Sequence, residues 1–310
     1  MSFAVLQAGI QSTLQEAPRR GVRYMGIPAS GPADTLSMAL ANRLVGNAAA
    51  ECALEVPYGM LSLKAMTDHI VGIAGATAAI NVDGQPGLMH RTLKIKAGQT
   101  LNIGAPEYGL RVYVAVSGGF AADTFLGNRS TCLPAGFGGL KGRALRKGDM
   151  LNTQNGGRGG SAILETPMKM RQVLSHSFAL RCVPGSDESR IPDWEHKQDF
   201  KATRRADRIG IEIAGSWPKL KGAGLKASAP VFPGAIQLTP SGTAFALLPD
   251  AQTTGGYPHV LQVALADRHL LGQIRPGDNI RFLKRSAEDA AYDLRLKQTF
   301  FEDWLPDLRL

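Results

Sequence analysis

Short apolar runs separated by glycine and proline dominate the chain. These runs predict β-strands at residues 70–73, 111–116, 177–183, 244–248 and 279–283. The 36 glycines and 18 prolines fall often between them, which is typical of many short strands joined by turns. The pattern predicts a fold that is mostly β with a few helices.

One combination of a turn and a strand occurs three times along the chain. It reads "KAGQTLNI" from Lys96, "RKGDMLNT" from Arg146 and "RPGDNIRF" from Arg275. In each copy the glycine can adopt the left-handed turn conformation, and an apolar strand follows directly. The repetition indicates two similar β units.

The glycine-rich segment 155–160, "NGGRGG", is the predicted flexible join between these units. We therefore expect one unit at residues 1–158 and a second at residues 159–310. The first should carry an amphipathic helix at 34–44, packed on a sheet, because its leucines share one stripe. The second should carry a C-terminal helix at 287–297, which follows the capping-box sequence "SAED".

The positive charge of the chain is spread along its length. Lys and Arg number 35 against 26 Asp and Glu, which gives a formal charge of +9. The densest cluster, 201–208 ("KATRRADR"), is interrupted by Asp207 and has no aromatic residues between its cations. We therefore expect no nucleic-acid binding. A solvated face or a local anion site explains the cluster.

The cysteines and the apolar segments indicate a reducing environment. Cys52, Cys132 and Cys182 are far apart in sequence and form no CxxC motif, so they predict neither a disulfide framework nor a zinc site. The longest uncharged apolar stretch, 70–80, is much shorter than the roughly 18 residues of a membrane-spanning helix. We expect a cytoplasmic protein without a membrane anchor.

The sequence "ETPMKM" at 165–170 invites comparison with the attachment site of a biotin carrier, with Lys169 as the modified residue. Pro167 argues against this interpretation, because it fixes φ and removes an amide donor that a hairpin tip needs. The expected upstream turn is also too far away. We interpret the sequence as a coincidence.

Two polar, glycine-bearing segments are candidates for chemistry. In 26–42, Ser30 and Gly31 lead to Asp34 at the start of the predicted helix, where free amides suit a carboxylate or phosphate. The alternative is that Ser30 and Asp34 are simply turn and cap residues.

The second segment, 249–258 ("PDAQTTGGYP"), places many hydrogen-bonding side chains beside two glycines that allow a ligand close to the backbone. These residues are Asp250, Gln252, Thr253, Thr254, Gly255, Gly256 and Tyr257. A polar turn without a ligand is the alternative. Arg129 and Arg208 could each hold a carboxylate or phosphate through two hydrogen bonds, or serve in structural ion pairs. No metal-binding pair of histidines and no phosphate loop is present in the sequence.

Several longer phrases occur together in one order, among them "SGPADTLSMALANRLVGNAAAECALE", "VSGGFAADTFLGNRST", "ADRIGIEIAG" and "PVFPGAIQLTPSGTAFALLPDAQTTGGYP". With these phrases the chain resembles the biotin-dependent carboxyltransferase subdomain A/B family, also called allophanate hydrolase subunit 2. That family includes the C subunit of bacterial ATP-dependent 5-oxoprolinases.

The resemblance implies two cyclophilin-like β-barrel subdomains and a hetero-oligomeric complex. The implied partner is of the allophanate-hydrolase-subunit-1 type, often with a third subunit of the LamB/YcsF type. The implied activity is hydrolysis of the lactam 5-oxo-L-proline to L-glutamate, with ATP bound by the complex and not necessarily by this chain.

The resemblance also leaves two alternatives. One is biotin-dependent transfer of a carboxyl group from carboxybiotin to urea or a related small amide, and the other is a non-catalytic antagonist of a kinase inhibitor. For the enzyme, Gln252, Thr253 and Thr254 are expected to contact the amide, together with the amides of Gly255 and Gly256. Asp250 would orient a water or a lysine or arginine side chain, and Arg129 and Arg208 would hold a carboxylate or phosphate.

Overall fold

The computed structural model describes residues 2–154, 162–192, 199–222 and 225–310. The chain forms two compact units. The first consists of Met1–Arg19, Ser30–Leu174 and Phe301–Arg309, and the second of Arg20–Ala29, Ser175–Phe300 and Leu310. The predicted join at 155–160 lies outside the described residues.

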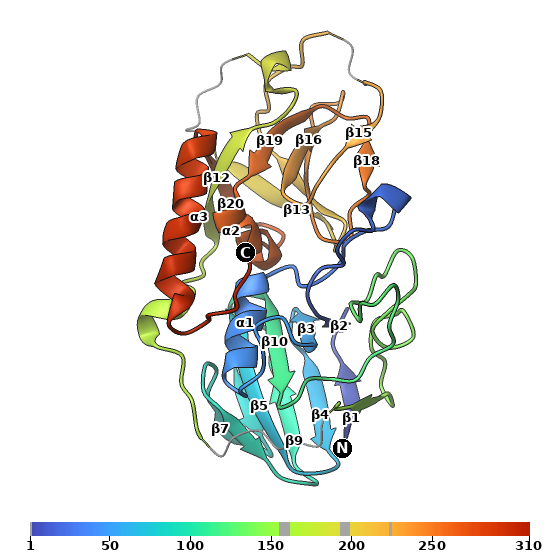
Figure 1. The fold of residues 1–310 in the computed structure, drawn as a ribbon, viewed down its shortest axis with the longest axis vertical. Helices are drawn as coiled ribbons and strands as arrows, with labels where there is room; N and C mark the ends of the chain where they lie inside the picture. The colour runs from blue at the N-terminus through green and yellow to red at the C-terminus, as the bar shows by residue number, and fades with distance from the viewer. Residues whose placement is uncertain (1, 155–161, 193–198, 223–224) are drawn as a thin grey trace. The chain divides into compact units, whose positions relative to one another are not determined.

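The first unit is built from a six-stranded and a five-stranded sheet (Figure 1). The larger sheet has the order β11 (Met150–Asn152), β1 (Ser2–Ala8), β4 (Leu61–Ala65), β9 (Thr100–Ile103), β6 (Ile80–Val82) and β7 (Gln85–Gly87). The smaller sheet has the order β2 (Thr13–Gln15), β3 (Ala53–Pro57), β10 (Tyr108–Val116), β5 (His69–Thr77) and β8 (Leu93–Ile95).

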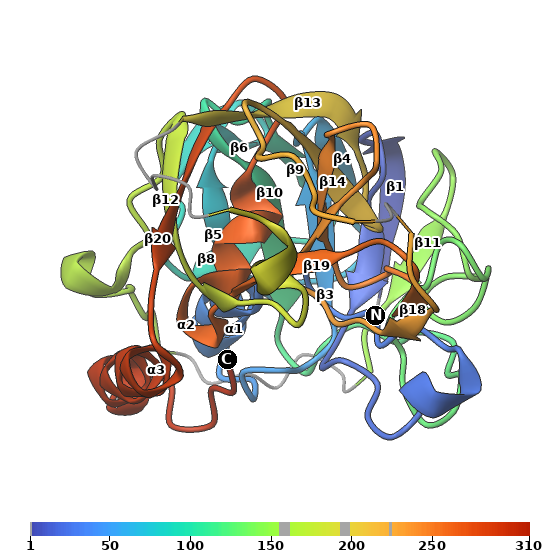
Figure 2. The ribbon, with the colours of Figure 1, turned by 90° about the horizontal axis from the view of Figure 1, so that it is seen from above.

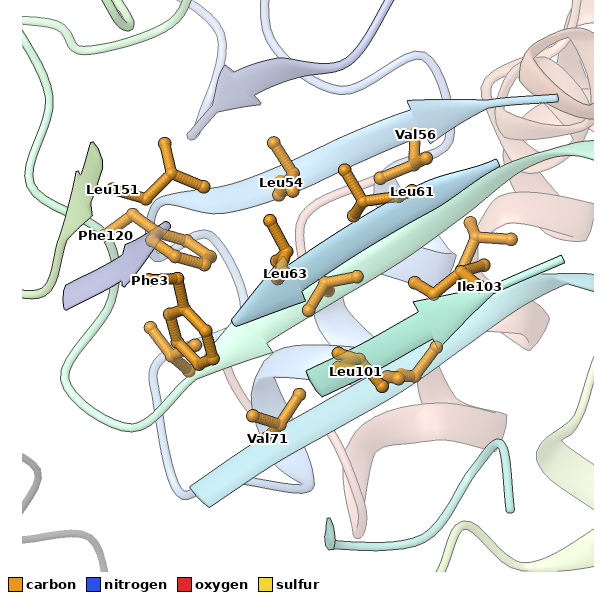
Figure 3. Packing of buried hydrophobic residues seen from close by; sticks show 14 of the residues in the cluster. Phe3, Leu54, Val56, Leu61, Leu63, Val71, Leu101, Ile103, Phe120 and Leu151 are labelled. Carbon is orange, nitrogen blue, oxygen red and sulfur yellow. The ribbon is translucent and has the colours of Figure 1, made fainter. Parts of the chain in front are cut away.

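The core of the first unit takes side chains from both sheets (Figure 3). Phe3, Leu63 and Leu101 come from the larger sheet, and Leu54 and Val71 from the smaller one. All five are buried. Packing between the two sheets therefore supplies the main apolar burial of this unit.

The second unit contains a closed barrel of seven strands. The strands follow one another as β12 (Ser177–Pro184), β19 (His259–Val263), β16 (Ala235–Leu238), β17 (Ala244–Leu247), β14 (Gly210–Ala214), β13 (Phe200–Ala206) and β20 (Asn279–Lys284). Only the β12–β20 pair is parallel among the strand pairs that the described residues form, and it closes the barrel. A short pair, β15 (Ala229–Pro230) and β18 (Thr254–Gly255), lies outside it.

An aromatic cluster fills part of the barrel. The ring of Phe200 lies 4.3 Å from that of Trp217 and 5.5 Å from that of Phe282, measured between centroids. The indole nitrogen of Trp217 donates to the carbonyl of Ile213 at 3.0 Å, so its polar atom is satisfied inside the core.

Three α-helices occur in the part of the chain that the structure describes: α1 (Thr35–Arg43), α2 (Leu265–Arg268) and α3 (Ala287–Glu302). Short 3-10 helices cover Arg23–Met25, Met168–Met170, Glu188–Arg190 and His269–Gln273. None of the helices in these described residues combines the length and hydrophobicity that crossing a bilayer requires. The mostly β fold class with a few helices is confirmed.

Both predicted helices are present. Helix α1 begins after Asp34, but residues 36–42 are all buried, so it lacks the exposed face of the expected amphipathic helix. It packs on β5 and β10, and the C-terminal segment contributes further contacts: Trp304 lies under the guanidinium of Arg43, and Asp307 accepts from the amide of Ala49. Ser286 caps α3, which lies beside β12 and β20 in Figures 1 and 2.

The three recurring turns have the same structure. Gly98, Gly148 and Gly277 have φ values of +87°, +91° and +94°. In each turn the fourth residue donates its backbone amide to the first, and its side chain accepts from the amide of that first residue. A strand begins two residues after each glycine, namely β9, β11 and β20.

Candidate functional site

A pocket of about 870 Å³ opens on the outside of the barrel in the second unit. Strands β13, β14, β16 and β17 contribute to its lining, together with the loop that follows β17. Two of the residues singled out in the sequence line it, Gln252 and Tyr257. The neighbouring strands add Arg204, Arg205, Glu212, Gln237 and Phe245, which the sequence analysis did not select.

Strand pairing explains how the floor of the pocket forms. Glu212 on β14 is paired with Phe245 on β17, and Phe245 is paired with Gln237 on β16. Ile211 and Ile213, the neighbours of Glu212, point into the barrel and are buried. The row from Glu212 to Gln237 therefore lies on the outer face of the barrel.

A bulge in β13 brings additional polar side chains to this row. Ala202 is opposite Ile213 and Ala206 is opposite Ile211, so residues 203–205 stand opposite Glu212 alone. Bulges commonly redirect side chains in this way. Thr203 Oγ1 donates to Glu212 Oε2 at 2.6 Å, and Arg205 Nη1 donates to Glu212 Oε1 at 2.9 Å.

Arg205 also lies over the aromatic floor. Its guanidinium carbon is 5.5 Å from the centroid of the Phe245 ring, within the range of a cation–π contact. The Arg205 side chain is 74% exposed, whereas that of Glu212 is 13% exposed. The Arg205 side chain thus keeps most of its surface accessible to an incoming anion.

Three consecutive hydrogen-bonding groups form the amide wall of the pocket, which we define as Gln252, Gln237 and the carbonyl of Tyr257. Gln252 Nε2 donates to Gln237 Oε1 at 3.3 Å, and Gln237 Nε2 donates to the Tyr257 carbonyl at 3.2 Å. Gln237 is 1% exposed although it belongs to the outer row, because the loop covers it.

Gly255 allows this covering. A Cβ atom at Gly255 would lie 2.7 Å from Gln237 Nε2, closer than real Cβ contacts. The sequence predicts that this glycine admits a ligand, whereas the structure shows the Gln237 amide in that space. A Cβ at Gly256 would meet the carbonyl of Lys226 at 3.0 Å, and the Gly256 carbonyl accepts from the Lys226 amide.

Backbone pairing holds the remaining residues of the loop. The amide of Val231 donates to the carbonyl of Thr253 at 3.0 Å. Thr254 belongs to β18 and is paired with Pro230 on β15. Neither threonine is among the residues that line the pocket.

Asp250 and Arg208 form a buried ion pair below the loop. Arg208 Nε lies 2.8 Å from Asp250 Oδ2, and Nη2 lies 3.1 Å from Oδ1. The two side chains are 1% and 0% exposed. Because the Asp250 amide also donates to the Arg208 carbonyl, this pair fixes the start of the loop. The structure therefore gives both residues a structural position outside the pocket lining.

In the first unit, Ser30, Gly31 and Asp34 lie at the start of α1. Ser30 and Gly31 both have positive φ, and a Cβ at Gly31 would collide with Pro18. Asp34 is buried, and its Oδ1 accepts from the Ser37 amide at 2.9 Å. Asp34 is thus the N-cap of α1.

Protein groups occupy the amides at this helix start. Glu55 Oε2 accepts from the Ala33 amide at 2.8 Å, and the Tyr113 hydroxyl accepts from the Asp34 amide at 2.8 Å. The Tyr113 hydroxyl donates in turn to Glu55 at 2.7 Å. Burial and the charge of Glu55 raise the pKa of Tyr113, which keeps its proton available for that bond. These contacts favour the turn-and-cap interpretation over an anion site.

Arg129 also belongs to the first unit and makes ion pairs there. Its Nε lies 2.5 Å from Glu16 Oε2, and its Nη2 lies 2.8 Å from Glu51 Oε1. A binding role for Arg129 stays a prediction.

Two of the buried cysteines, Cys52 and Cys182, are poor nucleophiles. Burial raises the pKa of the Cys52 and Cys182 thiols far above the ordinary range, so both stay protonated at neutral pH.

Within 2–154, 162–192, 199–222 and 225–310, no group of three or more His, Cys, Asp or Glu side chains is placed to hold a metal ion. Lys169 lies in the 3-10 helix Met168–Met170, not at the tip of a hairpin.

Comparison with known proteins identifies the family of this chain. The model of the carboxyltransferase domain, subdomain A and B, matches residues 25–284. The chain is 32% identical over 302 residues to the 5-oxoprolinase C subunit of Escherichia coli K12, with 96% of each chain covered. It is 33% identical over 305 residues to the Haemophilus influenzae protein of the same name, again with 96% of each chain covered.

A solved structure of the Kluyveromyces lactis urea carboxylase is similar throughout the chain. The TM-score is 0.85 at 25% identity, with all of this chain and 30% of that chain covered. This chain therefore spans about a third of that enzyme. From the family match and the two full-length relatives, we conclude that the chain belongs to the carboxyltransferase subdomain A and B family.

Proposed function

We propose that the chain is a subunit of an ATP-dependent 5-oxoprolinase and that the barrel pocket binds the lactam substrate, 5-oxo-L-proline. The observation that carries this proposal is the meeting of two kinds of group in one pocket: the carboxamide of Gln252, which Gln237 holds in place, and the guanidinium groups of Arg204 and Arg205. Similarity to two proteins named as C subunits of 5-oxoprolinase supports it.

The chemistry of the substrate matches these groups. A five-membered lactam acid presents a planar amide, with one donor and one acceptor, and a carboxylate. Carboxamides can complement the lactam amide, and guanidinium groups suit the carboxylate. Phe245 offers an apolar, flat surface in the same pocket for the ring carbons.

The lining suits a small acid better than a nucleotide. Its two arginines, Arg204 and Arg205, are balanced by Asp207 and Glu212. The Asp207 carboxylate already accepts from the amides of Ile209 and Gly210. A triphosphate would bring far more negative charge than this balanced lining can neutralise. We therefore assign ATP to another part of the complex.

What this chain contributes to hydrolysis is binding and orientation. Ring opening requires that the lactam carbonyl become a better acceptor for water, and a substrate held by both its amide and its carboxylate is fixed for that step. The proposed partner is a protein of the allophanate-hydrolase-subunit-1 type, with a LamB/YcsF-type protein as a further subunit.

A second candidate function is carboxyl transfer from carboxybiotin to urea or a related small amide, which leaves biotin. The similarity to the urea carboxylase structure favours it specifically. The same Gln252 carboxamide would suit urea, but Arg204 and Arg205 would then have no substrate carboxylate to bind. For this reason we rank the lactam acid first.

The test is reconstitution with the proteins encoded beside this chain. We expect ATP-dependent release of glutamate from 5-oxo-L-proline, and a marked rise in KM when Arg204 and Arg205 are both changed to Gln. Arg281→Gln is the control, because Arg281 lies on β20 and pairs with Asp199 away from the pocket. Carboxylation of urea by carboxybiotin, and no glutamate release, would support the second candidate instead.

A further inference from the structure

The amide wall has a defined direction. A glutamine carboxamide can often be turned over without changing its shape, but Gln237 is 1% exposed and one end of it faces the Tyr257 carbonyl. A carbonyl oxygen can only accept, so the end of Gln237 that faces it must be Nε2. Its Oε1 must then face Gln252.

The orientation of Gln252 follows from that of Gln237. The group that meets Gln237 Oε1 at 3.3 Å has to be a donor, which makes it Gln252 Nε2. The opposite rotamer would bring two carbonyl oxygens together and leave a buried acceptor without a donor. Gln252 Oε1 is therefore at the other end of the side chain, and it has no hydrogen-bond donor among the residues that the structure describes.

The backbone carbonyl of Gln252 is also held. Arg23 Nη2 lies 3.5 Å from it and 2.5 Å from the carbonyl of Val231. The arginine also lies over the ring of Phe232, with its guanidinium carbon 5.3 Å from the centroid. The loop is thus supported on the side of its backbone while the Gln252 side chain lines the pocket.

We propose that Gln252 recognises a ligand N–H through Oε1, and that Gln237 is the positioning residue that sets this polarity. The inference rests on the proposed function and deepens it, because it names the feature by which the site selects a lactam. A secondary lactam supplies the N–H. A lactone places an oxygen at the same position and would meet the Gln252 oxygen with repulsion.

The experiment compares two ligands with the same carboxylate and the same ring size. One is 5-oxo-L-proline, and the other is the lactone acid in which a ring oxygen replaces the N–H. Binding of each to the assembled complex is measured by calorimetry without ATP. We expect wild type to prefer the lactam, and Gln252→Leu to weaken lactam binding between roughly 3- and 10-fold while lactone binding does not weaken.

Gln237→Leu tests the positioning role. Leucine suits the apolar strand, but it frees Gln252 to turn and offer Nε2 to the lactone. We expect the preference for lactam over lactone to shrink although Gln252 is still present, a change that general loss of packing would not produce. Gln298→Leu on α3 is the matched control and should leave both affinities as in wild type.

The outcomes separate this inference from the proposed function. Equal losses for both ligands in Gln252→Leu, or no loss for either, would overturn the inference while turnover of 5-oxo-L-proline would still support the function. If Gln237→Leu does not fold, the Gln252→Leu comparison decides alone, because Gln252 is exposed and its loss leaves the barrel intact. A wild-type complex that neither binds nor hydrolyses 5-oxo-L-proline would overturn both.

Discussion

Asp250 accepts two hydrogen bonds from the guanidinium of Arg208 inside the second unit, at a site where both side chains are almost completely buried. The pair joins the end of the turn after β13 to the start of the loop that carries Gln252. It therefore links the stability of this unit to the shape of the proposed binding site.

Removing one member of this pair should destabilise the protein strongly. Arg208→Met leaves the Asp250 carboxylate buried without its cation, which typically costs about 3–5 kcal/mol. We expect the double change Arg208→Met, Asp250→Leu to cost less than the single change, since it leaves no unpaired charge. Urea unfolding measures both. The exposed pair of Arg281 and Asp199 is the control, and Arg281→Gln should change the free energy of unfolding by at most about 1 kcal/mol. A double variant less stable than Arg208→Met would contradict this account.

Gly255→Ala should impair binding more than folding. The new Cβ would displace the Gln237 amide, which it meets at 2.7 Å, and so disturb the orientation of Gln252. We expect a higher KM for 5-oxo-L-proline in the reconstituted complex. Gly104→Ala is a suitable control, because its φ is not positive and its nearest neighbour atom would be 3.4 Å away. An unchanged KM in Gly255→Ala would show that the position of the Gln237 side chain does not affect substrate binding.

Asp34→Ala should reduce stability through loss of the α1 cap, by about 1–2 kcal/mol. Asp34→Asn should cost less, because its side-chain oxygen can still accept from the Ser37 amide. Thermal unfolding gives the comparison. The KM of the folded Asp34→Asn variant should equal that of wild type, and a raised KM would instead support substrate binding by Asp34.

Stability should depend on the protonation of His90. Burial and then the charge of Arg171 lower the pKa of His90 to about 4 from its ordinary value of 6.5. Between these two pH values the unfolded chain binds a proton that the folded chain does not, so the free energy of unfolding falls as the pH falls, by at most about 3 kcal/mol.

His90→Asn isolates this contribution. His90 has a φ of +61°, and asparagine tolerates that conformation better than most residues. Carboxylates that titrate in the same range act equally in both proteins, so the difference between their stability curves reports His90. Parallel curves from pH 6.5 to pH 4 would show that the histidine does not contribute.

Features encoded by neighbouring residues could be predicted from the sequence. The turns at Gly98, Gly148 and Gly277 need only a left-handed glycine and a side-chain acceptor one position later, and all three formed. The start of α3 follows from the Ser286 cap in the same way, although the helix continues five residues beyond the predicted end at 297.

The pocket depends on strand pairing, which short-range patterns do not reveal. Glu212, Phe245 and Gln237 meet only because β14, β17 and β16 are neighbours in that order. One signal was available: Gln237 is the polar residue in the apolar run "AIQL", as Glu212 is in "GIEIA". A polar residue inside a short apolar strand indicates an outward-facing or satisfied position.

Individual residues of the loop could not be assigned for a related reason. Composition marked 249–258 as a binding segment, and Gln252 and Tyr257 do line the pocket. It could not show that Asp250 would be held by Arg208, which is 42 positions away in sequence. In the basic cluster 201–208, by contrast, the sequence did not mark Arg204 and Arg205 as site residues, yet they line the pocket. The bulge in β13 brings them there, and a bulge cannot be read from the sequence.

The most direct measurement is a structure of the assembled complex crystallised with 5-oxo-L-proline. We predict the lactam in the barrel pocket, with its N–H on Gln252 Oε1 and its carboxylate beside Arg204 or Arg205. A lactam bound elsewhere in the complex, with this pocket filled only by solvent, would contradict this prediction.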